Sequence, residues 1–243
     1  MRTEELAGQV GGVASLAEPV RRDLYLYVAS QPDPVSRDQA SAALDVPRHT
    51  AKFHLDRLVA DGLLAVEFRR LTGRRGPGAG RPTKLYRRSG RQLEVSLPER
   101  HYDLAGQLMA RAIEETAREG GDVVDAVLRK AAQRGTVIGE EVRAGLGHDA
   151  GHRQRLAATC EALADQGYEP RRTGDAVELA NCPFHALARE HTDLVCGMNL
   201  ALIGAAVSQV DPDGLTARLD PAPDRCCVVL STTQQPDTPS EPA

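Results

Sequence analysis

The apolar residues in the N-terminal part of the chain recur every three or four positions, which is the spacing of amphipathic helices. Three helices are predicted there, over Glu18–Ser30, Arg37–Leu44 and Pro47–Ala60. Ser36 is a favourable N-cap for the second helix, and Pro47 suits the first turn of the third. Gly62 follows the third helix and is expected to end it.

The pattern then changes to an alternation of apolar and polar residues, which is typical of strands. Two strands are predicted, over Leu63–Arg70 and Thr83–Arg88, and residues 72–82 between them contain four glycines and two prolines. Residues 31–35 contain two prolines and are predicted to be a loop. Helices followed by such a hairpin predict a winged helix-turn-helix domain over residues 15–97, preceded by a flexible arm, residues 1–14.

Helical spacing returns in the second half of the chain, interrupted by short strand-like runs. Helices are predicted over Tyr102–Arg118, Val123–Arg143, His152–Gln166, Pro183–Glu190 and Asp193–Val210. Strands are predicted over Tyr168–Arg172, Ala176–Asn181, Leu215–Leu219 and Cys226–Leu230.

These elements predict an α+β protein with two further parts behind the winged helix-turn-helix. We expect residues 98–148 to be a helical linker that carries dimerisation, and residues 149–230 to be a small C-terminal α/β sensor domain. Residues 231–243 have no apolar side chain larger than proline or alanine, so they are expected to be a disordered tail.

Charge is distributed unevenly along the chain. Residues 1–97 carry 16 Arg or Lys against 11 Asp or Glu, whereas residues 98–243 carry 14 against 23. From Arg69 to Arg91 there are nine basic residues and no acidic one. Such a cluster predicts contact with the phosphates of double-stranded DNA through the front half of the chain. The alternatives are a solvated charged face, or a winged helix used for protein contact.

The residues expected to touch DNA come from the third helix and from the hairpin. They are Arg48, His49, Thr50, Lys52 and Phe53 on the helix, and Arg69, Arg70, Arg74, Arg75, Arg81 and Lys84 on the hairpin. Arginine reads guanine in the major groove, and an arginine at a glycine-rich tip can enter the minor groove. Phe53 is expected either to meet a base methyl group or to cover the first helices.

The segment VPRHTAKFHLDRLVADGLL, with GRPTKLYRRS after it, resembles the recognition helix and wing of bacterial transcriptional regulators of the ArsR/MarR-like winged-helix type. Two such domains reading a twofold-symmetric site match the symmetry of the duplex, so a homodimer is expected. The helix over residues 102–118 is the expected dimer seam, although its apolar stripe could instead face the helix over residues 123–143.

Cysteines form the second notable group. Cys182, Cys196 and the pair Cys226–Cys227 lie on three separate elements, and thiolates suit iron–sulphur clusters, zinc or copper(I). Because neighbouring strand residues point to opposite faces, only one member of the pair is expected to join the other two thiols. The alternative is that the cysteines are small buried hydrophobic residues, which is also the reading for Cys160.

The stretch NCPFHALAREHTDLVCGMNLALIGA, followed by PDRCCVVL, resembles the sensor domain of the SufR-type iron–sulphur repressors. The resemblance implies a cluster held by Cys182, Cys196 and Cys227 that governs operator binding by a homodimer. Zinc is the alternative metal, and His185 is a candidate fourth ligand. The chain departs from the family at Gly197, where an acidic residue is expected.

The expected function is therefore a DNA-binding transcriptional regulator, acting as a repressor, that senses iron–sulphur or redox status. The alternatives are a winged-helix regulator that binds a small organic effector and one with a structural zinc site. An enzyme is not expected, because the sequence has no Walker-type loop, no HExxH motif and no third group to orient a Cys182–His185 pair. Without a signal peptide or a convincing membrane span, the protein is expected in the cytoplasm.

Overall fold

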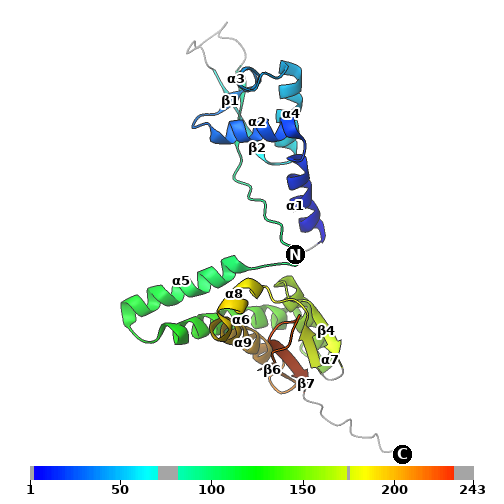
Figure 1. The fold of residues 1–243 in the computed structure, drawn as a ribbon. Coiled ribbons are helices and arrows are strands. Elements are labelled where there is room, and N and C mark those ends of the chain that lie inside the picture. The colour runs from blue at the N-terminus through cyan, green and yellow to red at the C-terminus, as the bar shows by residue number, and fades with distance from the viewer. Residues whose placement is uncertain (1–2, 71–81, 174–175, 233–243) are drawn as a thin grey trace, which may run out of the picture. The chain divides into compact units, whose positions relative to one another are not determined.

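The computed structural model describes residues 3–70, 82–173 and 176–232, and its fold class is α+β (Figure 1). The chain divides into two compact units between Val95 and Ser96. This division lies two residues before the end of the predicted winged domain. We refer to the two parts as the N-terminal unit and the C-terminal unit.

The N-terminal unit contains four helices and a three-stranded antiparallel sheet of order β1-β3-β2 within the described residues. The helices are α1 (Thr3–Ser15), α2 (Pro19–Ser30), α3 (Arg37–Ala43) and α4 (Arg48–Ala60). The strands are β1 (Val35–Ser36), β2 (Leu64–Arg69) and β3 (Thr83–Arg88). This is the predicted winged helix-turn-helix, with a helix α1 in front of it.

Local sequence signals define the ends of these helices. The Glu18 carboxylate accepts hydrogen bonds from two backbone amides in the first turn of α2. Ser36 and Gln39 form a reciprocal capping box at the start of α3. Gly62 has a φ of 73°, which glycine adopts without strain, and it turns the chain from α4 into β2.

Two segments of this unit differ from the sequence-based predictions. The expected flexible arm is wrong for the described residues, because Thr3–Ser15 form α1. Gly12 leaves room on α1 for the side chain of Leu93, and Arg91 donates a hydrogen bond to the carbonyl of Gly8. Residues 31–35 are not entirely a loop, since β1 begins at Val35 and pairs with β3.

The C-terminal unit contains five helices and a four-stranded antiparallel sheet of order β4-β5-β7-β6 within the described residues. The helices are α5 (Tyr102–Glu119), α6 (Val123–Gly145), α7 (His152–Asp165), α8 (His185–Glu190) and α9 (Thr192–Val210). The strands are β4 (Pro170–Thr173), β5 (Ala176–Leu179), β6 (Leu215–Leu219) and β7 (Val228–Thr232).

Helix α9 lies at the centre of this unit, between α6 and the sheet. The helices α6 and α9 approach so closely that a Cβ atom built at Gly135 would lie 1.9 Å from the carbonyl oxygen of Leu202. At Gly139 it would lie 2.5 Å from the carbonyl oxygen of Ala206. The two glycines therefore permit a backbone contact that no larger residue allows.

The predicted separate linker is wrong, because residues 98–148 share one hydrophobic core with the rest of the C-terminal unit. Ala105 and Leu108 of α5 and Ala131 of α6 are buried in the same cluster as Val177 and Leu202. The alternative prediction, in which the stripe of α5 faces α6, agrees with this packing. Helices α5 and α6 are thus part of the C-terminal unit's core.

The end of the chain also differs from expectation. Ser231 and Thr232, predicted to begin the tail, are the last residues of β7. Residues 233–243 lie outside the described part of the chain. Strand β7 begins two residues later than predicted, so Cys226 and Cys227 precede the strand and do not alternate across it.

Among the described helices, only α9 is long and apolar enough to span a membrane. Half of its most apolar window is buried inside the C-terminal unit. Its buried residues include Val195, Met198, Leu202 and Val207, which are part of the core. Helix α9 therefore has the burial of a core helix, as the sequence predicts.

Candidate functional site

The helix-turn-helix is formed by α3, a short turn and α4. Asp45 occupies the turn with a φ of 52°, a left-handed conformation that aspartate tolerates better than most residues. The Ser41 hydroxyl donates a hydrogen bond of 2.6 Å to the carbonyl of Val46 and fixes the exit of the turn. Helix α4 then begins directly after Pro47, with Arg48, His49 and Thr50 in its first turn.

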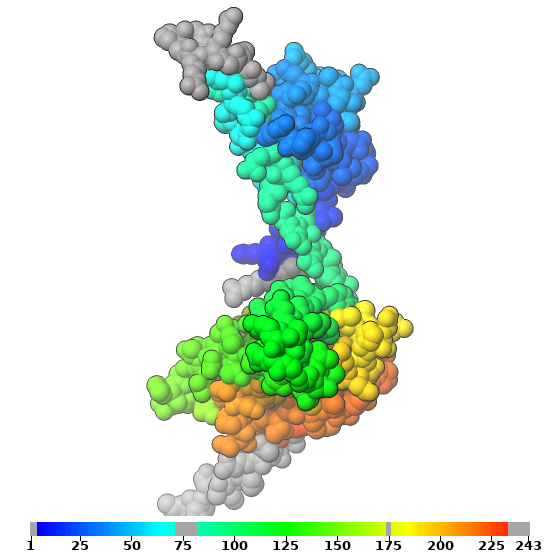
Figure 2. All heavy atoms as spheres, turned by 90° about the vertical axis from the view of Figure 1, so that its left-hand side faces the viewer, coloured from blue at the N-terminus to red at the C-terminus, as the bar shows by residue number. Residues whose placement is uncertain are grey.

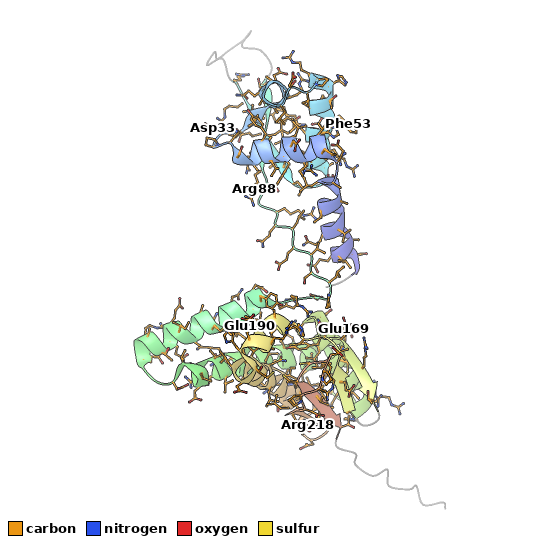
Figure 3. The ribbon with its side chains drawn as sticks, in the orientation of Figure 1. Asp33, Phe53, Arg88, Glu169, Glu190 and Arg218 are labelled. Atoms are coloured by element: carbon orange, nitrogen blue, oxygen red, sulfur yellow. The ribbon has the colours of Figure 1, made fainter. Side chains whose placement is uncertain are left out.

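The outer face of α4 carries the predicted DNA-contacting side chains. Arg48, His49, Lys52 and Phe53 are exposed, and Thr50 is half-buried. Phe53, labelled in Figure 3, is 63% exposed. It therefore does not cover the first helices, which excludes one of the two roles considered for it from the sequence.

Several of the predicted cations are held by carboxylates of their own unit. Arg48 lies 2.7 Å from Asp38 of α3, and Arg69 lies 2.7 Å from Glu67 of β2. Lys52 and Lys84 both pair with Asp56, at 3.0 and 2.5 Å. All these ion pairs are partly or largely exposed, so DNA phosphates can compete with the carboxylates.

Asp56 connects the recognition helix to the wing. Besides both lysines, it accepts a 2.9 Å hydrogen bond from the hydroxyl of Tyr86 in β3. Partial burial raises the pKa of Asp56, but hydrogen bonds from Lys84, Lys52 and Tyr86 outweigh this and lower it to about 2. The carboxylate is thus charged at neutral pH and holds β3 against α4.

The remaining residues of the wing are only partly described. Arg70 follows β2 and is exposed, whereas the predicted contacts Arg74, Arg75 and Arg81 lie outside the described residues. The structure brings Arg48, Lys52, Phe53 and Lys84 together around α4 and β3.

Sequence reasoning missed a buried polar group behind the recognition helix. His54 of α4 is 9% exposed, and its Nδ1 accepts a 3.3 Å hydrogen bond from Arg21 Nε. The Glu18 carboxylate lies 3.5 Å from the same nitrogen. The sequence did contain a signal for the burial of His54, because His54 is three positions after the inward-facing Ala51 and so lies on the same face of the helix. These contacts tie α4 to α2.

Four cysteines of the C-terminal unit form a cluster of thiols. Cys182 follows β5, Cys196 lies on α9, and Cys226 and Cys227 precede β7. Hydrogen-bonding thiol neighbours connect Cys182 to Cys226, Cys226 to Cys227, and Cys227 to Cys196. All four are free thiols.

The prediction that only one member of the Cys226–Cys227 pair joins the cluster is wrong. Strand alternation does not apply there, because the chain bends at Cys227 before β7 begins. Cys226 is almost completely buried, as expected for a core residue, but its thiol also contacts those of Cys182 and Cys227. Cys160 lies on α7 and is half-buried.

The pKa values of three of these thiols, those of Cys182, Cys196 and Cys226, are raised. The hydrogen bond to Cys226 and then burial raise the pKa of Cys182 above its ordinary value. Burial raises the pKa of Cys196 as well. For Cys226, the contact with Cys182 lowers the pKa, but the contact with Cys227 and burial raise it to about 12.

A buried polar relay ends on the sulphur of Cys226. The Asn199 side-chain amide donates a 3.0 Å hydrogen bond to Cys226 Sγ, and the backbone amide of Val228 lies 3.5 Å from the same atom. The hydroxyl of Tyr168 in turn donates to Asn199 Oδ1. Asn199 is 1% exposed in an otherwise apolar stretch of α9, so its polar atoms are satisfied by these contacts.

The cluster has the donor chemistry of a soft metal site, because four thiols from three chain segments meet in one place. Within residues 3–70, 82–173 and 176–232, however, no group of three or more His, Cys, Asp or Glu side chains is arranged to hold a metal ion. Binding would require the sulphurs to lose protons and turn toward a common centre. His185, the candidate fourth ligand, has an exposed side chain.

The segment that carries Cys182 is bound to the first residues of the C-terminal unit. Arg100 Nη1 donates a 2.8 Å hydrogen bond to the carbonyl of Cys182 and another to the side chain of Asn181. Asn181 donates to the carbonyl of Glu99, and the backbone amide of His101 donates to the carbonyl of Pro183. We call residues 99–101 together with residues 181–183 the clasp.

Comparison with protein families gives a match over residues 16–67 to a family described as a helix-turn-helix domain. The N-terminal unit is a helix-turn-helix domain. The matched residues include α2, α3, α4 and the first part of β2, and the β1-β3-β2 sheet makes the domain a winged one. Such a domain indicates a DNA-binding transcriptional regulator. Comparisons with curated proteins and with solved structures give no match.

Proposed function

We propose that this protein is a transcriptional repressor whose helix-turn-helix domain binds an operator and whose thiol cluster senses iron–sulphur or redox status. The observation that supports DNA binding best is the outer face of α4, where Arg48, His49, Lys52 and Phe53 are exposed beside the wing. No enzymatic activity is part of the proposal. The protein is proposed to act in the cytoplasm, where it would meet its operator.

Helix α4 has the size and the exposed N-terminal turn of a helix that enters the major groove. In this proposal Arg48 contacts a guanine, and Phe53 meets a thymine methyl group. Lys52 and Lys84 supply charge for backbone phosphates. Binding would exchange the ion pairs to Asp38 and Asp56 for contacts with DNA, so it should weaken as salt is raised.

Operator binding is tested by selecting genomic fragments with the purified protein and measuring their affinity at several salt concentrations. Arg48→Ala should weaken binding to the selected site more than binding to unrelated duplex, because a base contact is lost. Arg153→Ala removes an exposed arginine of the C-terminal unit and serves as the matched control. Equal affinity for every duplex in the wild-type protein would contradict the operator proposal.

For the sensing half, the proposed cofactor is an iron–sulphur cluster held by Cys182, Cys196 and Cys227, with zinc as the alternative. Support comes from the resemblance of the cysteine segments and from the meeting of these thiols with that of Cys226. Such a cluster responds to oxidants and to iron supply. Asn199 and the backbone of Val228 supply hydrogen bonds to sulphur, which are the usual means by which a protein tunes such a site.

The clasp gives the sensing site a route to the DNA-binding domain. Residues 99–101 begin only a few positions after the division between the units at Val95 and Ser96. Any movement of the Cys182 segment would act directly on Glu99 and Arg100 through their hydrogen bonds to Asn181 and Cys182. We therefore place the coupling in the clasp and not in a separate helical linker.

Cofactor binding is tested by anaerobic purification with iron, sulphide and zinc quantified. The wild type is compared with Cys182→Ser, Cys196→Ser and Cys227→Ser, and Cys160→Ser is the control because Cys160 lies outside the cluster. The three cluster variants should lose metal and the control should keep it. Equal metal content in all variants would defeat the sensor proposal and leave DNA binding untouched.

A further inference from the structure

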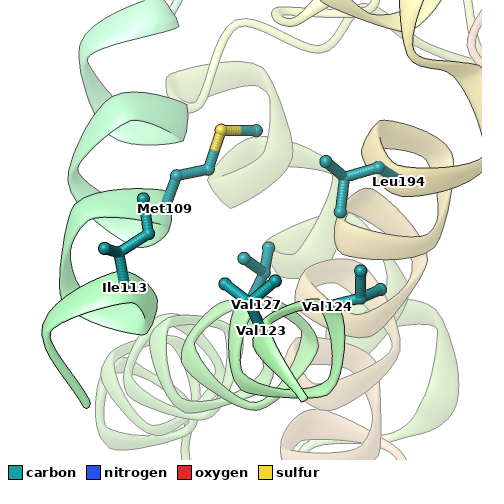
Figure 4. Close-up of a pocket in the computed structure, with 6 residues that line it drawn as sticks. All are labelled: Met109, Ile113, Val123, Val124, Val127 and Leu194. Carbon is teal, nitrogen blue, oxygen red and sulfur yellow. The ribbon is translucent and has the colours of Figure 1, made fainter. Parts of the chain in front are cut away.

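Recognition of a particular DNA sequence needs polar side chains that can meet the edges of the bases. A pocket of the C-terminal unit, shown in Figure 4, has no such group in its lining. Its volume is about 160 Å³, and it is lined by Met109, Ile113, Val123, Val124, Val127 and Leu194. Charged side chains suited to base edges lie instead in the first turns of α3 and α4.

A single carboxylate connects these two first turns. Asp38 Oδ1 accepts a 3.2 Å hydrogen bond from Nε of Arg37, and Asp38 Oδ2 lies 2.7 Å from Nη2 of Arg48. Each carboxylate oxygen therefore faces a different guanidinium. The side chain of Asp38 is 48% exposed and that of Arg48 is 68% exposed, so a ligand can reach both. Figure 2 shows the blue part of the chain, which includes α3, at the surface of the N-terminal unit.

The carboxyl group of Asp38 is charged at neutral pH. Slight burial raises its pKa, but the hydrogen bond from Arg37 and the charges of Arg48 and Arg37 outweigh this and lower it. The two guanidiniums and the carboxylate together carry one net positive charge. An anion that approaches Arg48 therefore meets a like charge within hydrogen-bonding distance of the guanidinium.

We propose that Asp38 is a positioning residue that directs Arg48 to a guanine and away from phosphates. A phosphate that takes Arg48 leaves Asp38 beside a second anion, and two like charges at such short range repel each other. The O6 and N7 acceptors of guanine belong to a neutral base, so no such repulsion arises.

The geometry of the guanidinium permits both contacts at once. It has five N–H donors, and Asp38 lies against only one of the nitrogens of Arg48. Arg48 can therefore bind the two acceptors of a guanine through its other N–H groups while it still faces Asp38. The exchange of this ion pair is thus partial at a guanine and complete at a phosphate.

Asp38 also lies in the first turn of α3, where a carboxylate stabilises a helix through the helix dipole. This structural role would affect the unfolding temperature and would not depend on Arg48. A positioning role instead affects the balance between operator and unrelated duplex, and only when Arg48 is present. The inference rests on the proposed binding of an operator by α4, and the thiol cluster plays no part in it.

The test measures the affinity of the full chain for a selected operator fragment and for an unrelated duplex at several salt concentrations. Asp38→Asn keeps the size of the side chain and removes its charge. It should raise affinity for the unrelated duplex about threefold or more, as expected for the loss of one exposed competing charge. The salt dependence of that binding should steepen by about one unit, because Arg48 gains a phosphate. Operator affinity should rise less, so the ratio of the two affinities falls.

Two further variants separate the positioning role from a structural one. Asp38→Glu keeps the charge and should keep most of the affinity ratio. When Arg48→Ala is already present, Asp38→Asn should leave the ratio unchanged, because the contact that it redirects is gone. Any effect through Arg37 would strengthen phosphate binding on both duplexes and would leave the ratio the same.

Asp33→Asn is the matched control, because Asp33, labelled in Figure 3, is an exposed carboxylate of the same unit. Its removal changes the net charge by the same amount and should affect both duplexes alike. Thermal unfolding of every variant checks that the fold is retained.

Three results would overturn the inference. If Asp38→Asn keeps the wild-type affinity ratio, Asp38 does not direct Arg48, although operator binding itself stands. If the ratio falls equally with and without Arg48, or equally in Asp33→Asn, the effect does not pass through Arg48. If the wild type binds every duplex with equal affinity, the operator proposal fails and the inference fails with it.

Discussion

Two polar side chains, Asp56 and Asn199, each connect separate elements of their unit through hydrogen bonds. Asp56 holds two lysines and a tyrosine, and so fixes the wing to the recognition helix. Asn199 likewise connects Tyr168 to Cys226 inside the C-terminal unit, because it accepts a hydrogen bond from the first and donates one to the second. Both residues are polar and lie on helices whose other inward-facing side chains pack in a core. No sequence motif marks the role of either residue.

Replacing Asp56 should reveal a pH-dependent contribution to stability. The pKa of Asp56 is lowered from 3.8 to about 2, so its stabilising effect is complete above about pH 4 and is lost as the pH falls toward 2. Asp56→Asn should therefore lower the free energy of unfolding of the N-terminal unit by about 1 kcal/mol at neutral pH. Calorimetry at pH 7 and in steps below pH 4 should show the difference from wild type narrowing with acid.

Asp33→Asn is the control for this experiment, because Asp33 is an exposed carboxylate of the same unit. Its effect should be small at every pH. A difference between wild type and Asp56→Asn that stays constant down to pH 2 would show that the ion pairs contribute nothing.

Removing the Asn199 amide should leave Tyr168 without its buried acceptor. Asn199→Leu is expected to destabilise the C-terminal unit by about 1–3 kcal/mol, the usual effect of an unsatisfied buried polar group. Adding Tyr168→Phe removes the stranded hydroxyl, so the double variant should be less destabilised than the sum of the two single variants. Chemical denaturation of the three variants measures this coupling, and simple additivity would contradict the relay.

Residue roles were only partly accessible from the sequence. Spacing and residue type predicted which side chains of α4 face outward, because helical periodicity fixes the phase. The exposure of Phe53 was undecidable, since an aromatic side chain at that position suits either a core or an interface. The partners of Asp38 and Asp56 depend on α3 and β3, which the local pattern does not place.

At the scale of elements, the packing of α6 on α9 is the tightest feature of the C-terminal unit. Gly135 and Gly139 lie one helical turn apart and meet the backbone of α9 at Leu202 and Ala206. Helix α9 also carries Cys196 and Asn199. The thiol site is therefore built on a helix whose position is fixed along its length.

Gly135→Ala should be strongly destabilising for this reason. The added methyl group would clash with the carbonyl of Leu202, which belongs to a helix backbone and cannot turn away, so a loss of about 1–3 kcal/mol is expected. Gly197→Ala on α9 is the matched control, because its Cβ would meet only the side-chain end of Leu128 at 3.5 Å. The control should be neutral or slightly stabilising through helix propensity. Urea unfolding followed by circular dichroism compares the two, and equal stability would contradict the close contact.

An error in the predicted start of β7 led to a wrong prediction about the cysteine pair. Most helices and strands were predicted within two or three residues, because periodicity reports their middles well. Strand β7 starts at Val228 and not at Cys226, and that shift of two residues invalidated the alternation argument for the cysteine pair. A turn before a strand has no periodicity of its own, so its end cannot be read from the pattern.

At the scale of the whole molecule, the clasp connects the first residues of the C-terminal unit to the segment of Cys182. Residues 99–101 follow the division at Val95 and Ser96 and hydrogen-bond to the segment of Cys182. The sequence did not predict this arrangement, because residues 82 positions apart carry no shared local signal. The packing of the predicted linker into the C-terminal unit was missed for the same reason.

Arg100→Ala should separate sensing from DNA binding. The variant loses the hydrogen bonds to Asn181 and Cys182 but keeps the recognition helix and all five cysteines. We expect wild-type operator affinity in the metal-free protein and a smaller change in affinity when iron or zinc is added. Fluorescence anisotropy with labelled operator measures both, with Arg153→Ala as control. If adding metal changes the operator affinity of Arg100→Ala as much as that of the wild type, the coupling does not run through the clasp. If it leaves the affinity of the wild type unchanged, the sensor proposal itself fails.

The late position of Cys226 and Cys227 has a consequence for synthesis. A ribosome completes the whole winged domain well before it reaches the last thiols, which lie just ahead of the final strand. Under the proposed function, a product that stops before Cys226 would keep the helix-turn-helix domain but lack the proposed metal ligand Cys227, so it would bind the operator without responding to iron or oxidants.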